Sequence, residues 1–584
     1  MPDTDYSKAS RNCDVVMKGG ITSGLVYPAA VCRLAAEYRF RSIGGTSAGA
    51  IAAAATAAAE YGRRTGKGTS FKELETLPSL LAGPRLFKLF QPQPQTENLF
   101  QTLTAGLRGA RGVLPFLGAA VRQYLPFALL GAAPILFFVA PAFSLATLFF
   151  VGFFAAVFSW IPWLLLAAVG AAVGVALAVL HDLRKKVPAN FFGLCTGMGS
   201  DEALTPWLHD LLQRLSGKPK EEPLTFGDLW GDDPSKREVD LQMMTTSLTF
   251  GRPSRLPFPP EEERLYFFKR EEMEKLFPKP VVDWMCAKAR PESCQAGFSP
   301  LPPMRDLPVI VAMRMSLSFP LLIGAVPLHA VDADSGATVP EPVWFSDGGI
   351  ASNFPVHFFD SPLPGWPTFA INLRYFEEKP SREVVMPETN RDGVAERFHR
   401  FEKAGLLGFV RAIFDAMQNW QDNTQVRMPG FRDRVAHVCL GPGEGGLNLE
   451  MPEAVVKTIA ARGAQAGEML AQRFAPGSPA ALNWDNHRWV RLRSMLASLE
   501  EMLEKLGPRL SPDWKPPQPG DEPYAALLAK EAPPSFPWKE GQRAEAARAV
   551  EEIRTTALRW VESPERLRRG APRPMPELRA RPKV

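Results

Sequence analysis

Gly44-Gly45-Thr46-Ser47-Ala48-Gly49 is a G-x-S-x-G motif, and its surroundings decide the fold. A short segment with apolar ends, 40–43, precedes it, and an alanine-rich segment, 50–59, follows it. This pattern predicts a strand, a tight turn and a helix, which together form a nucleophile elbow. Such a turn strains the serine backbone and lifts its hydroxyl above the sheet edge, so Ser47 is the candidate nucleophile. The motif glycines that let strand and helix approach closely are Gly45 and Gly49.

Composition excludes several classes of function. The chain has 584 residues, enough for one large domain or two to three ordinary ones. Its net charge of +5 is too small an excess to indicate a nucleic-acid partner. The 6 cysteines contain no C-x-x-C pair, so we expect a reducing compartment and neither a zinc site nor a disulfide scaffold. Residues 1–12 are polar without an apolar core, so we expect no signal peptide and a cytosolic catalytic portion.

A second glycine-rich loop, Gly19-Gly20-Ile21-Thr22-Ser23-Gly24, lies between a predicted strand, 13–17, and a predicted amphipathic helix, 25–38. Backbone amides in such a loop suit an anion, either a nucleotide phosphate or the oxyanion of acyl transfer. The nucleotide is disfavoured because a full G-x-G-x-x-G, a Walker lysine and an acidic residue after a second strand are all missing. The oxyanion is favoured because Ser47 follows soon after the loop, as adjacent strands of one parallel sheet would require.

The most apolar part of the chain is 123–180, which comprises 58 residues without a single Asp, Glu, Lys or Arg. As one helix it would measure about 87 Å against a hydrocarbon core of about 30 Å, so two spans with a turn fit. We expect spans at 124–150 and 158–180, with the turn near Ser159. Basic residues flank both ends, which places both ends on the cytoplasmic side. The alternatives are a re-entrant hairpin, interfacial helices in one leaflet, or a buried soluble helical pair.

Three later segments predict further strands. Residues 237–248 predict a strand that ends in small hydroxyl residues, and 308–313 (PVIVAM) predict a buried strand. The third ends at Asp347, which is followed by Gly348 and Gly349. An aspartate at a strand end stands where open α/β sheets carry their chemistry, although Asp-Gly-Gly is also typical of a plain turn.

Histidine is scarce near these motifs. The seven histidines are His181, His209, His329, His357, His399, His437 and His487. None lies in a glycine-rich strand-end setting, and His357 is the best candidate for a Ser-His-Asp esterase. A Ser-Asp pair, in which the carboxylate itself accepts the serine proton, is the other interpretation. It requires Ser47 and Asp347 within hydrogen-bond reach.

Taken in chain order, the Gly19–Gly24 loop, Gly45-Thr46-Ser47-Ala48-Gly49 and Asp347-Gly348-Gly349 resemble the motifs of the patatin-like phospholipases. Ser316-x-Ser318-x-Pro320 and Ser352-Asn353-Phe354-Pro355 support the resemblance, which covers 12–375 and is interrupted at 62–190. It implies an α/β fold with a three-layer core and a central, mostly parallel sheet. The apolar stretch adds an inserted transmembrane helical hairpin, and a mainly helical region follows the core.

The resemblance also implies a chemistry: hydrolysis of lipid acyl esters by a Ser-Asp dyad through an acyl-enzyme, with no metal and no cofactor. By position, Ser47 is the nucleophile and Asp347 the general base. The implied oxyanion hole comprises Gly19, Gly20 and Ile21, and the motif-supporting residues are Gly24, Gly45, Gly49, Gly348 and Gly349. The family loop reads G-G-G-x-[RK]-G, so Ile21 and Ser23 depart from it. This departure motivates the alternative of a catalytically silent membrane scaffold.

After the core, 376–475 is predicted to be a helical extension, and 476–584 a charged, proline-rich and partly disordered region. Predicted helices are 398–421, 448–474, 489–506 and 541–562, and 435–440 is a predicted strand. The basic end, 566–584, is interpreted as a solvated tail or as a segment attracted to anionic headgroups. The expected partners are membrane lipids as substrate and the bilayer. We expect the catalytic domain to face the cytoplasm at a bacterial inner membrane.

Overall fold

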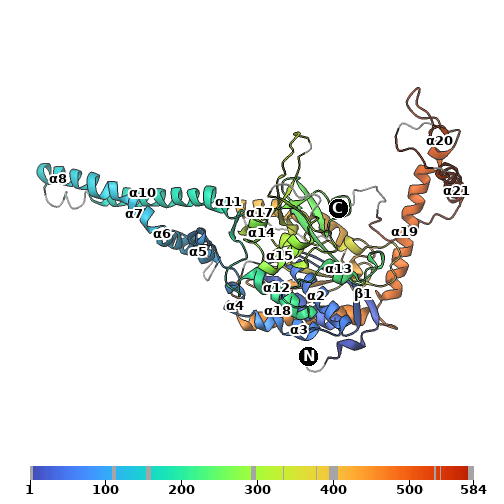
Figure 1. The fold of residues 1–584 in the computed structure, drawn as a ribbon, viewed down its shortest axis with the longest axis horizontal. Helices are drawn as coiled ribbons and strands as arrows, with labels where there is room; N and C mark the ends of the chain where they lie inside the picture. Colours follow the sequence, from blue (N-terminus) through green and yellow to red (C-terminus); the bar gives the residue numbers. More distant parts are fainter. Residues whose placement is uncertain are drawn as a thin grey trace.

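The computed structural model describes residues 4–107, 113–152, 155, 160–290, 297–332, 334–376, 378–393, 405–446, 448–531, 535–539 and 541–576. An α/β core lies at the centre (Figure 1). Two long apolar helices project from one side of the core, and the last helices of the chain extend from the other (Figure 1).

The core contains an 11-stranded sheet within the described residues. In spatial order its strands are β12 (Val384–Val385), β13 (Val435–Leu440), β11 (Thr368–Tyr375), β1 (Arg11–Met17), β2 (Tyr38–Thr46), β4 (Asp240–Ser247), β10 (Glu341–Asp347), β9 (Val326–Ala330), β6 (Phe267–Phe268) and β7 (Ser299–Pro300), and β5 (Arg252–Leu256) pairs with β4. The strands β13, β11, β1, β2 and β4 are parallel. The other pairings are antiparallel, so the expectation of a mostly parallel sheet is correct only for this central part. A separate parallel pair joins β3 (Gly193–Cys195) to β8 (Leu321–Ile323).

Both faces of the central strands are buried. Successive side chains of a strand point to opposite sides, and here consecutive residues belong to two different hydrophobic clusters. In β1, Val15 and Met17 belong to the larger hydrophobic cluster, whereas Val16 belongs to a smaller one. In β11, Ile371 and Ala370 divide in the same way. Burial on both faces explains why 15–17 in β1 and 369–371 in β11 are uninterrupted apolar runs in the sequence.

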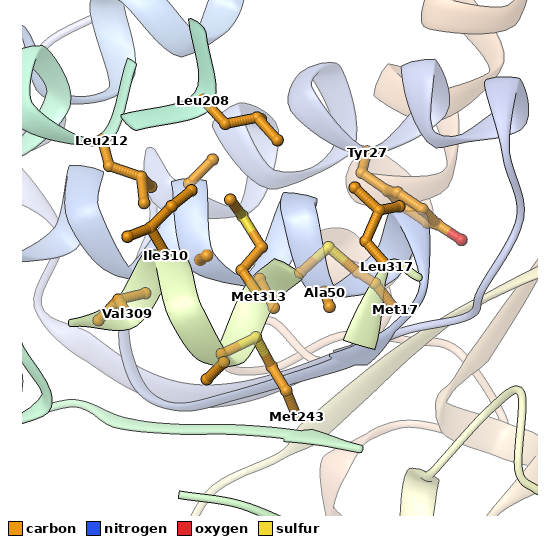
Figure 2. Close-up of a cluster of buried hydrophobic side chains, with 14 of the residues drawn as sticks. Met17, Tyr27, Ala50, Leu208, Leu212, Met243, Val309, Ile310, Met313 and Leu317 are labelled. Carbon is orange, nitrogen blue, oxygen red and sulfur yellow. The ribbon is translucent and has the colours of Figure 1, made fainter. Parts of the chain in front are cut away.

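Helices surround the sheet. The core helices are α1 (Tyr27–Ala35), α2 (Ala48–Thr65), α3 (Ser70–Leu80), α4 (Pro84–Lys88), α12 (Leu204–Ser216), α13 (Phe226–Trp230), α14 (Arg270–Met273), α15 (Lys279–Lys288), α16 (Val309–Ser316) and α18 (Glu453–Arg473). Figure 2 shows side chains of α2, α12 and α16 packed on those of β1 and β4, with Leu208, Met313 and Met243 among them. The later helices are α17 (Gly405–Val426), α19 (Trp484–Leu506), α20 (Tyr524–Ala529) and α21 (Gln542–Glu562).

The prediction of a strand at 308–313 was wrong, because Val309–Ser316 forms the helix α16. All eight residues of α16 are buried. An apolar run that is buried on every side has no periodicity, so its sequence alone does not separate a strand from a buried helix.

The core extends past the predicted limits. The strands β12 and β13 lie in the sheet although they follow residue 375. Inside the predicted insert, α3 packs into the hydrophobic core through Phe71, Leu74 and Leu77. The predicted helices at 448–474, 489–506 and 541–562 correspond to α18, α19 and α21. The start of the predicted helix 398–421, His399 and the end of the basic tail lie outside the described residues.

The apolar stretch forms an arm of two helical runs, reached through α5 (Glu97–Leu107) and α6 (Val113–Gln123) (Figure 1). The first run joins α7 (Leu125–Pro134), the π-helical turn Ile135–Val139 and α8 (Ala140–Phe150). The second is α10 (Trp160–His181), which continues through a π-helical turn and α11 (Val187–Ala189). Both are long and apolar enough to cross a membrane, and only 11% and 17% of their most apolar windows are buried, unlike the helices of a soluble core. The predicted turn at Ser159 lies outside the described residues.

Glycines let the two runs pack closely. A Cβ at Gly131 would collide with the carbonyl oxygen of Gly170, and one at Gly174 would collide with that of Phe127. Gly170 and Gly174 form a G-x-x-x-G pattern, which allows backbones to approach in apolar surroundings. At the base of the arm, the Tyr124 hydroxyl donates to Asp182 Oδ2 at 2.9 Å.

Gly170→Val is expected to weaken this helix pair, because the added Cβ meets backbone atoms of Gly131 that have no room to move. Overpacking of this kind costs about 1–3 kcal/mol, measurable as a lower unfolding temperature of the detergent-solubilised protein. The control is Gly118→Val in α6, where an added Cβ meets nothing within 4 Å. Equal destabilisation by both variants would contradict close packing at Gly170.

Candidate active site

The register of three neighbouring strands brings Ser47 and Asp347 together. In β2, Thr46 pairs with Met244 of β4, and Ser47 follows directly. In β10, Asp347 pairs with Thr245, the next residue of β4. β4 therefore separates two strand ends at the same height, one leading into Ser47 and the other ending at Asp347.

Ser47 occupies a strained turn between β2 and α2. Its φ of 55° and ψ of −129° lie in a region that non-glycine residues rarely adopt. The turn requires glycine at two positions. A Cβ at Gly45 would collide with the carbonyl of Gly49, and a Cβ at Gly49 would collide with the carbonyl of Met17. Ser47 N–H donates to Ser316 Oγ at 3.2 Å, and the Ser47 side chain stands at the N-terminus of α2. The local structure is the predicted elbow.

Asp347 is buried next to this serine. Its Oδ1 accepts a hydrogen bond from Gly349 N–H at 2.7 Å, whereas Oδ2 has no hydrogen-bond partner of regular geometry within the described residues. Burial raises the pKa of Asp347 from 3.8 to about 7, while the Ser47 hydroxyl and then Gly349 N–H partly oppose this rise. The Ser47 hydroxyl is therefore near enough to stabilise the carboxylate, and Oδ2 is free to accept a proton.

A buried arginine holds the end of β10. Arg314, fully buried in α16, donates to Ser318 Oγ at 2.8 Å and to the carbonyls of Thr196 and Gly324 at 2.8 and 3.0 Å. Ser318 in turn accepts from Asp347 N–H at 3.0 Å through its carbonyl oxygen. Burial lowers the pKa of Arg314 to about 9. This chain of contacts fixes the backbone that carries Asp347.

The glycine-rich loop packs against Ser47. A Cβ at Gly19 would collide with Asn353 Oδ1 and lie 3.2 Å from Ser47 Cβ. Gly19 N–H donates to the Asn353 carbonyl at 2.7 Å, so it is not available to an oxyanion, contrary to its predicted role. Among the described residues, the N–H groups of Gly20 and Ile21 form no hydrogen bond and are available.

Close packing also explains two further motif glycines, Gly24 and Gly348. It explains as well why position 23 holds a serine and not the basic residue of the family loop. A Cβ at Gly24 would approach Ala48 Cβ at 3.2 Å, and one at Gly348 would collide with the Met244 carbonyl. Ser23, where the family has a basic residue, is fully buried, and its hydroxyl lies 2.6 Å from that of Tyr375. The position is part of the packed interior.

The contacts between α17 and the segment that follows Asp347 were not predicted from the sequence. Asp422 of α17 accepts hydrogen bonds from Ser352 Oγ at 3.0 Å and from the N–H groups of Asn353 and Phe354, both at 2.8 Å. Gln418, one turn earlier in α17, donates to the Gly349 carbonyl. The segment between Asp347 and Pro355 is thus held from α17.

An apolar cavity of about 90 Å³ begins beside the site. Ile21 and Gly24 of the glycine-rich loop line it, as does Ala48, which follows the candidate nucleophile. From there the cavity follows one face of α2 through Ile51, Ala52, Ala55 and Thr56, at the i, i+3, i+4, i+7 and i+8 positions of a helix. Its other walls include Leu77, Leu208 and Leu322.

Four of the seven histidines have hydrogen-bond partners other than Ser47 and Asp347. His329 lies 2.7 Å from Glu272, and His487 lies 2.6 Å from Asp433. His437 lies 3.0 Å from Asn372, and His209 lies 3.0 Å from the Lys220 carbonyl. The remaining described ones are His181, at the end of α10, and His357, whose ring packs edge-to-face on Phe358.

Sequence reasoning missed three contributors to this arrangement, Arg314, Asp422 and the N–H of Ala48, and it named Ser316 only as part of a motif, without its contact with the Ser47 N–H. Ala48 is the first residue of α2, so its N–H has no intrahelical acceptor. The elbow motif itself signals this group, since the residue after the nucleophile commonly supplies an oxyanion donor. No pattern signals Asp422, which is 75 residues distant from Asp347 in a helix of ordinary composition.

Comparison with known proteins identifies the family of this chain. The sequence model of the patatin-like phospholipase family matches residues 15–126, which include the glycine-rich loop and Ser47. The RpoH suppressor of Rhizobium meliloti (strain 1021) is 39% identical, and the match covers 98% of this chain and 99% of that protein. The chain belongs to the patatin-like phospholipase family. Membership implies lipid acyl hydrolase activity in general.

Two solved structures are more distantly similar. VipD from Legionella pneumophila is 11% identical, with a TM-score of 0.29 and matches covering 94% of this chain and 86% of that one. Full-length ExoU from Pseudomonas aeruginosa, in complex with SpcU, is 14% identical, with a TM-score of 0.22 and coverage of 96% and 73%. Because both TM-scores lie below 0.5, neither structure adds to the interpretation of the site.

Proposed function

We propose that this chain is a membrane-anchored hydrolase of phospholipid or lysophospholipid acyl esters, with Ser47 as nucleophile and Asp347 as general base. The observation that carries the proposal is the buried Oδ2 of Asp347, which has no hydrogen-bond partner in the described part of the chain and lies beside a serine in a strained elbow. A carboxyl with a pKa of about 7 is suited to take and return a proton near neutral pH.

The steps follow from the geometry. Asp347 Oδ2 accepts the proton of Ser47 Oγ as that oxygen attacks the ester carbonyl. The N–H groups of Gly20, Ile21 and Ala48 are the donors for the oxyanion, assisted by the N-terminus of α2. Asp347 then protonates the leaving alcohol, and an acyl-enzyme on Ser47 remains. Water, deprotonated by Asp347, releases the fatty acid and regenerates the serine.

The cavity supports an acyl substrate. Its walls are apolar, it starts at the glycine-rich loop and Ala48, and it leads away from Ser47 along α2. An acyl chain placed there would remove its apolar surface from water at about 25 cal/mol per Å². The two exposed apolar helices support a membrane location, since anchoring raises the effective concentration of a poorly soluble substrate.

The direct test is incubation of the purified full-length protein, reconstituted in vesicles, with phospholipid and with lysophospholipid, followed by mass spectrometry of the products. Release of free fatty acid with the matching deacylated lipid supports the proposal. A well-folded protein that releases neither from any tested headgroup would contradict it and favour the catalytically silent scaffold.

The cavity yields a chain-length prediction. Ala55→Phe is expected to fill the cavity seven residues beyond Ala48 and shift preference toward shorter acyl esters, because Ala55 lines the cavity and is 1% exposed. One lost methylene contact is worth about 10-fold or more in discrimination, so the ratio of kcat/KM for long and short p-nitrophenyl esters should fall by at least that factor. Thr65→Phe, at the exposed end of α2, is the control. An unchanged ratio in Ala55→Phe would exclude the cavity as the acyl site.

A further inference from the structure

The helix α17 presents an apolar stripe to solvent. Its exposed members are Leu406 (77%), Val410 (40%), Ile413 (44%), Met417 (67%) and Trp420 (64%). They are spaced alternately by four and three residues, so they share one face of the helix. The stripe spans 14 residue steps, or about 21 Å. An apolar stripe normally faces a core, and here it faces away from one.

The opposite face of α17 binds the core, so the direction of the stripe is fixed. Asp422, 2% exposed, accepts the three hydrogen bonds from 352–354, and Gln418 binds Gly349. Val426 is buried with Phe354 and Phe431. Rotating the stripe inward would break all of these contacts.

The observations favour a lipid bilayer as the occupant of this face. The chain already carries two helices that are apolar and largely exposed, which need lipid around them. Figure 1 shows α17 toward the end of the core from which this arm projects. Apolar side chains are also exposed at the root of the arm, where Phe192 (46%) follows α11 and Leu321 (57%) pairs with Gly193. A tryptophan at the end of the stripe fits the headgroup level of a bilayer.

We propose that α17 lies in the membrane interface with this stripe among the acyl chains, and that it thereby holds the 349–354 loop at the active site. The second part rests on the proposed function. The coupling is direct, because Asp422 binds Asn353 N–H, and the Asn353 carbonyl binds Gly19 N–H in the glycine-rich loop beside Ser47. Contact with lipid would keep α17 seated and the site in its assembled geometry.

The first part is tested by a depth measurement that needs no catalysis. Met417→Cys carries an environment-sensitive fluorophore in a Cys286→Ser/Cys294→Ser background, reconstituted in vesicles of phosphatidylcholine and phosphatidylglycerol containing doxyl-labelled lipid. Asp415→Cys, exposed on the other side of α17, is the control. We expect doxyl quenching at 417 and iodide quenching at 415. Equal quenching by aqueous iodide at both positions would overturn the proposal. It would also be overturned if neither iodide nor doxyl lipid quenched the fluorophore at 417 because a second copy of the chain covers it.

The coupling is tested by Ile413→Asp/Met417→Asp in the full-length protein. In the vesicle-reconstituted protein, hydrolysis of a soluble short-chain ester should fall together with hydrolysis of vesicle phospholipid, each roughly tenfold or more, because both reactions need the site geometry that α17 holds. Ala544→Asp/Ala547→Asp, on the exposed side of α21, adds the same charge away from α17 as a control. Loss on vesicle phospholipid alone would overturn the coupling and leave α17 as an anchor only, and no loss on either substrate would overturn it as well. If wild type hydrolyses neither substrate, the proposed function fails, and the depth measurement still decides the position of α17.

Discussion

Ser47→Ala is expected to lower kcat/KM for ester hydrolysis by about 10³-fold to 10⁶-fold, because the nucleophile is lost while the oxyanion donors stay in place. The fold should not change, since the substitution keeps the Ser47 N–H, which donates to Ser316 Oγ. Initial rates with a p-nitrophenyl ester measure the effect.

A surface serine supplies the matched control for this variant. Ser235→Ala removes an exposed hydroxyl and should keep wild-type rates. Residual activity within tenfold of wild type in Ser47→Ala, at equal folded protein, would mean that another residue or a bound water carries the reaction.

The second large effect concerns Asp347. Because burial raises its pKa to about 7, the ionised base dominates only above neutral pH. The rate should therefore rise about tenfold between pH 6 and pH 8 and then level off. Asp347→Asn is expected to remove this dependence and to lower the rate by about 10³-fold to 10⁴-fold, because an amide does not accept the serine proton. A pH-rate profile of both proteins is the measurement.

The free energy of unfolding should fall as pH rises, whereas the reaction rate increases. The unfolded chain ionises Asp347 near 3.8, whereas the folded chain does so near 7, so between these values the folded state binds the extra proton. The free energy of unfolding due to this group therefore falls as pH rises from about 4 to 7. Asp347→Asn should then unfold at a higher temperature than wild type at pH 8 and show little difference at pH 4. A variant less stable at pH 8 would contradict the burial of an unpaired carboxylate.

The elbow at Ser47 and the strand end at Asp347 were predictable because they depend on local sequence. The alternation of a short apolar run, a glycine-rich turn and an alanine-rich helix describes β2 and α2 closely, although both extend past the predicted ends. The pairing of Ser47 with Asp347 was suggested by the motif set. The structure places them on either side of β4 through a register that no local pattern encodes.

The errors have physical causes too. α16 was mistaken for a strand because its burial on all sides erased the helical period. Gly19 was expected in the oxyanion hole, but a carbonyl 334 residues later, at Asn353, takes its N–H. Asp422 could not be found because its role depends on α17 packing against 352–354, which is a tertiary contact. Predictions failed where a distant segment decides the function of a residue.

The most direct test of the Ser-Asp site is fluorophosphonate labelling of the detergent-solubilised full-length protein, with the modified peptide mapped by mass spectrometry. An activated serine reacts with this probe, so we expect one adduct on Ser47, no adduct in Ser47→Ala and a sharply reduced rate in Asp347→Asn. Labelling of a different serine, or equal labelling of wild type and Asp347→Asn, would contradict a Ser47–Asp347 dyad.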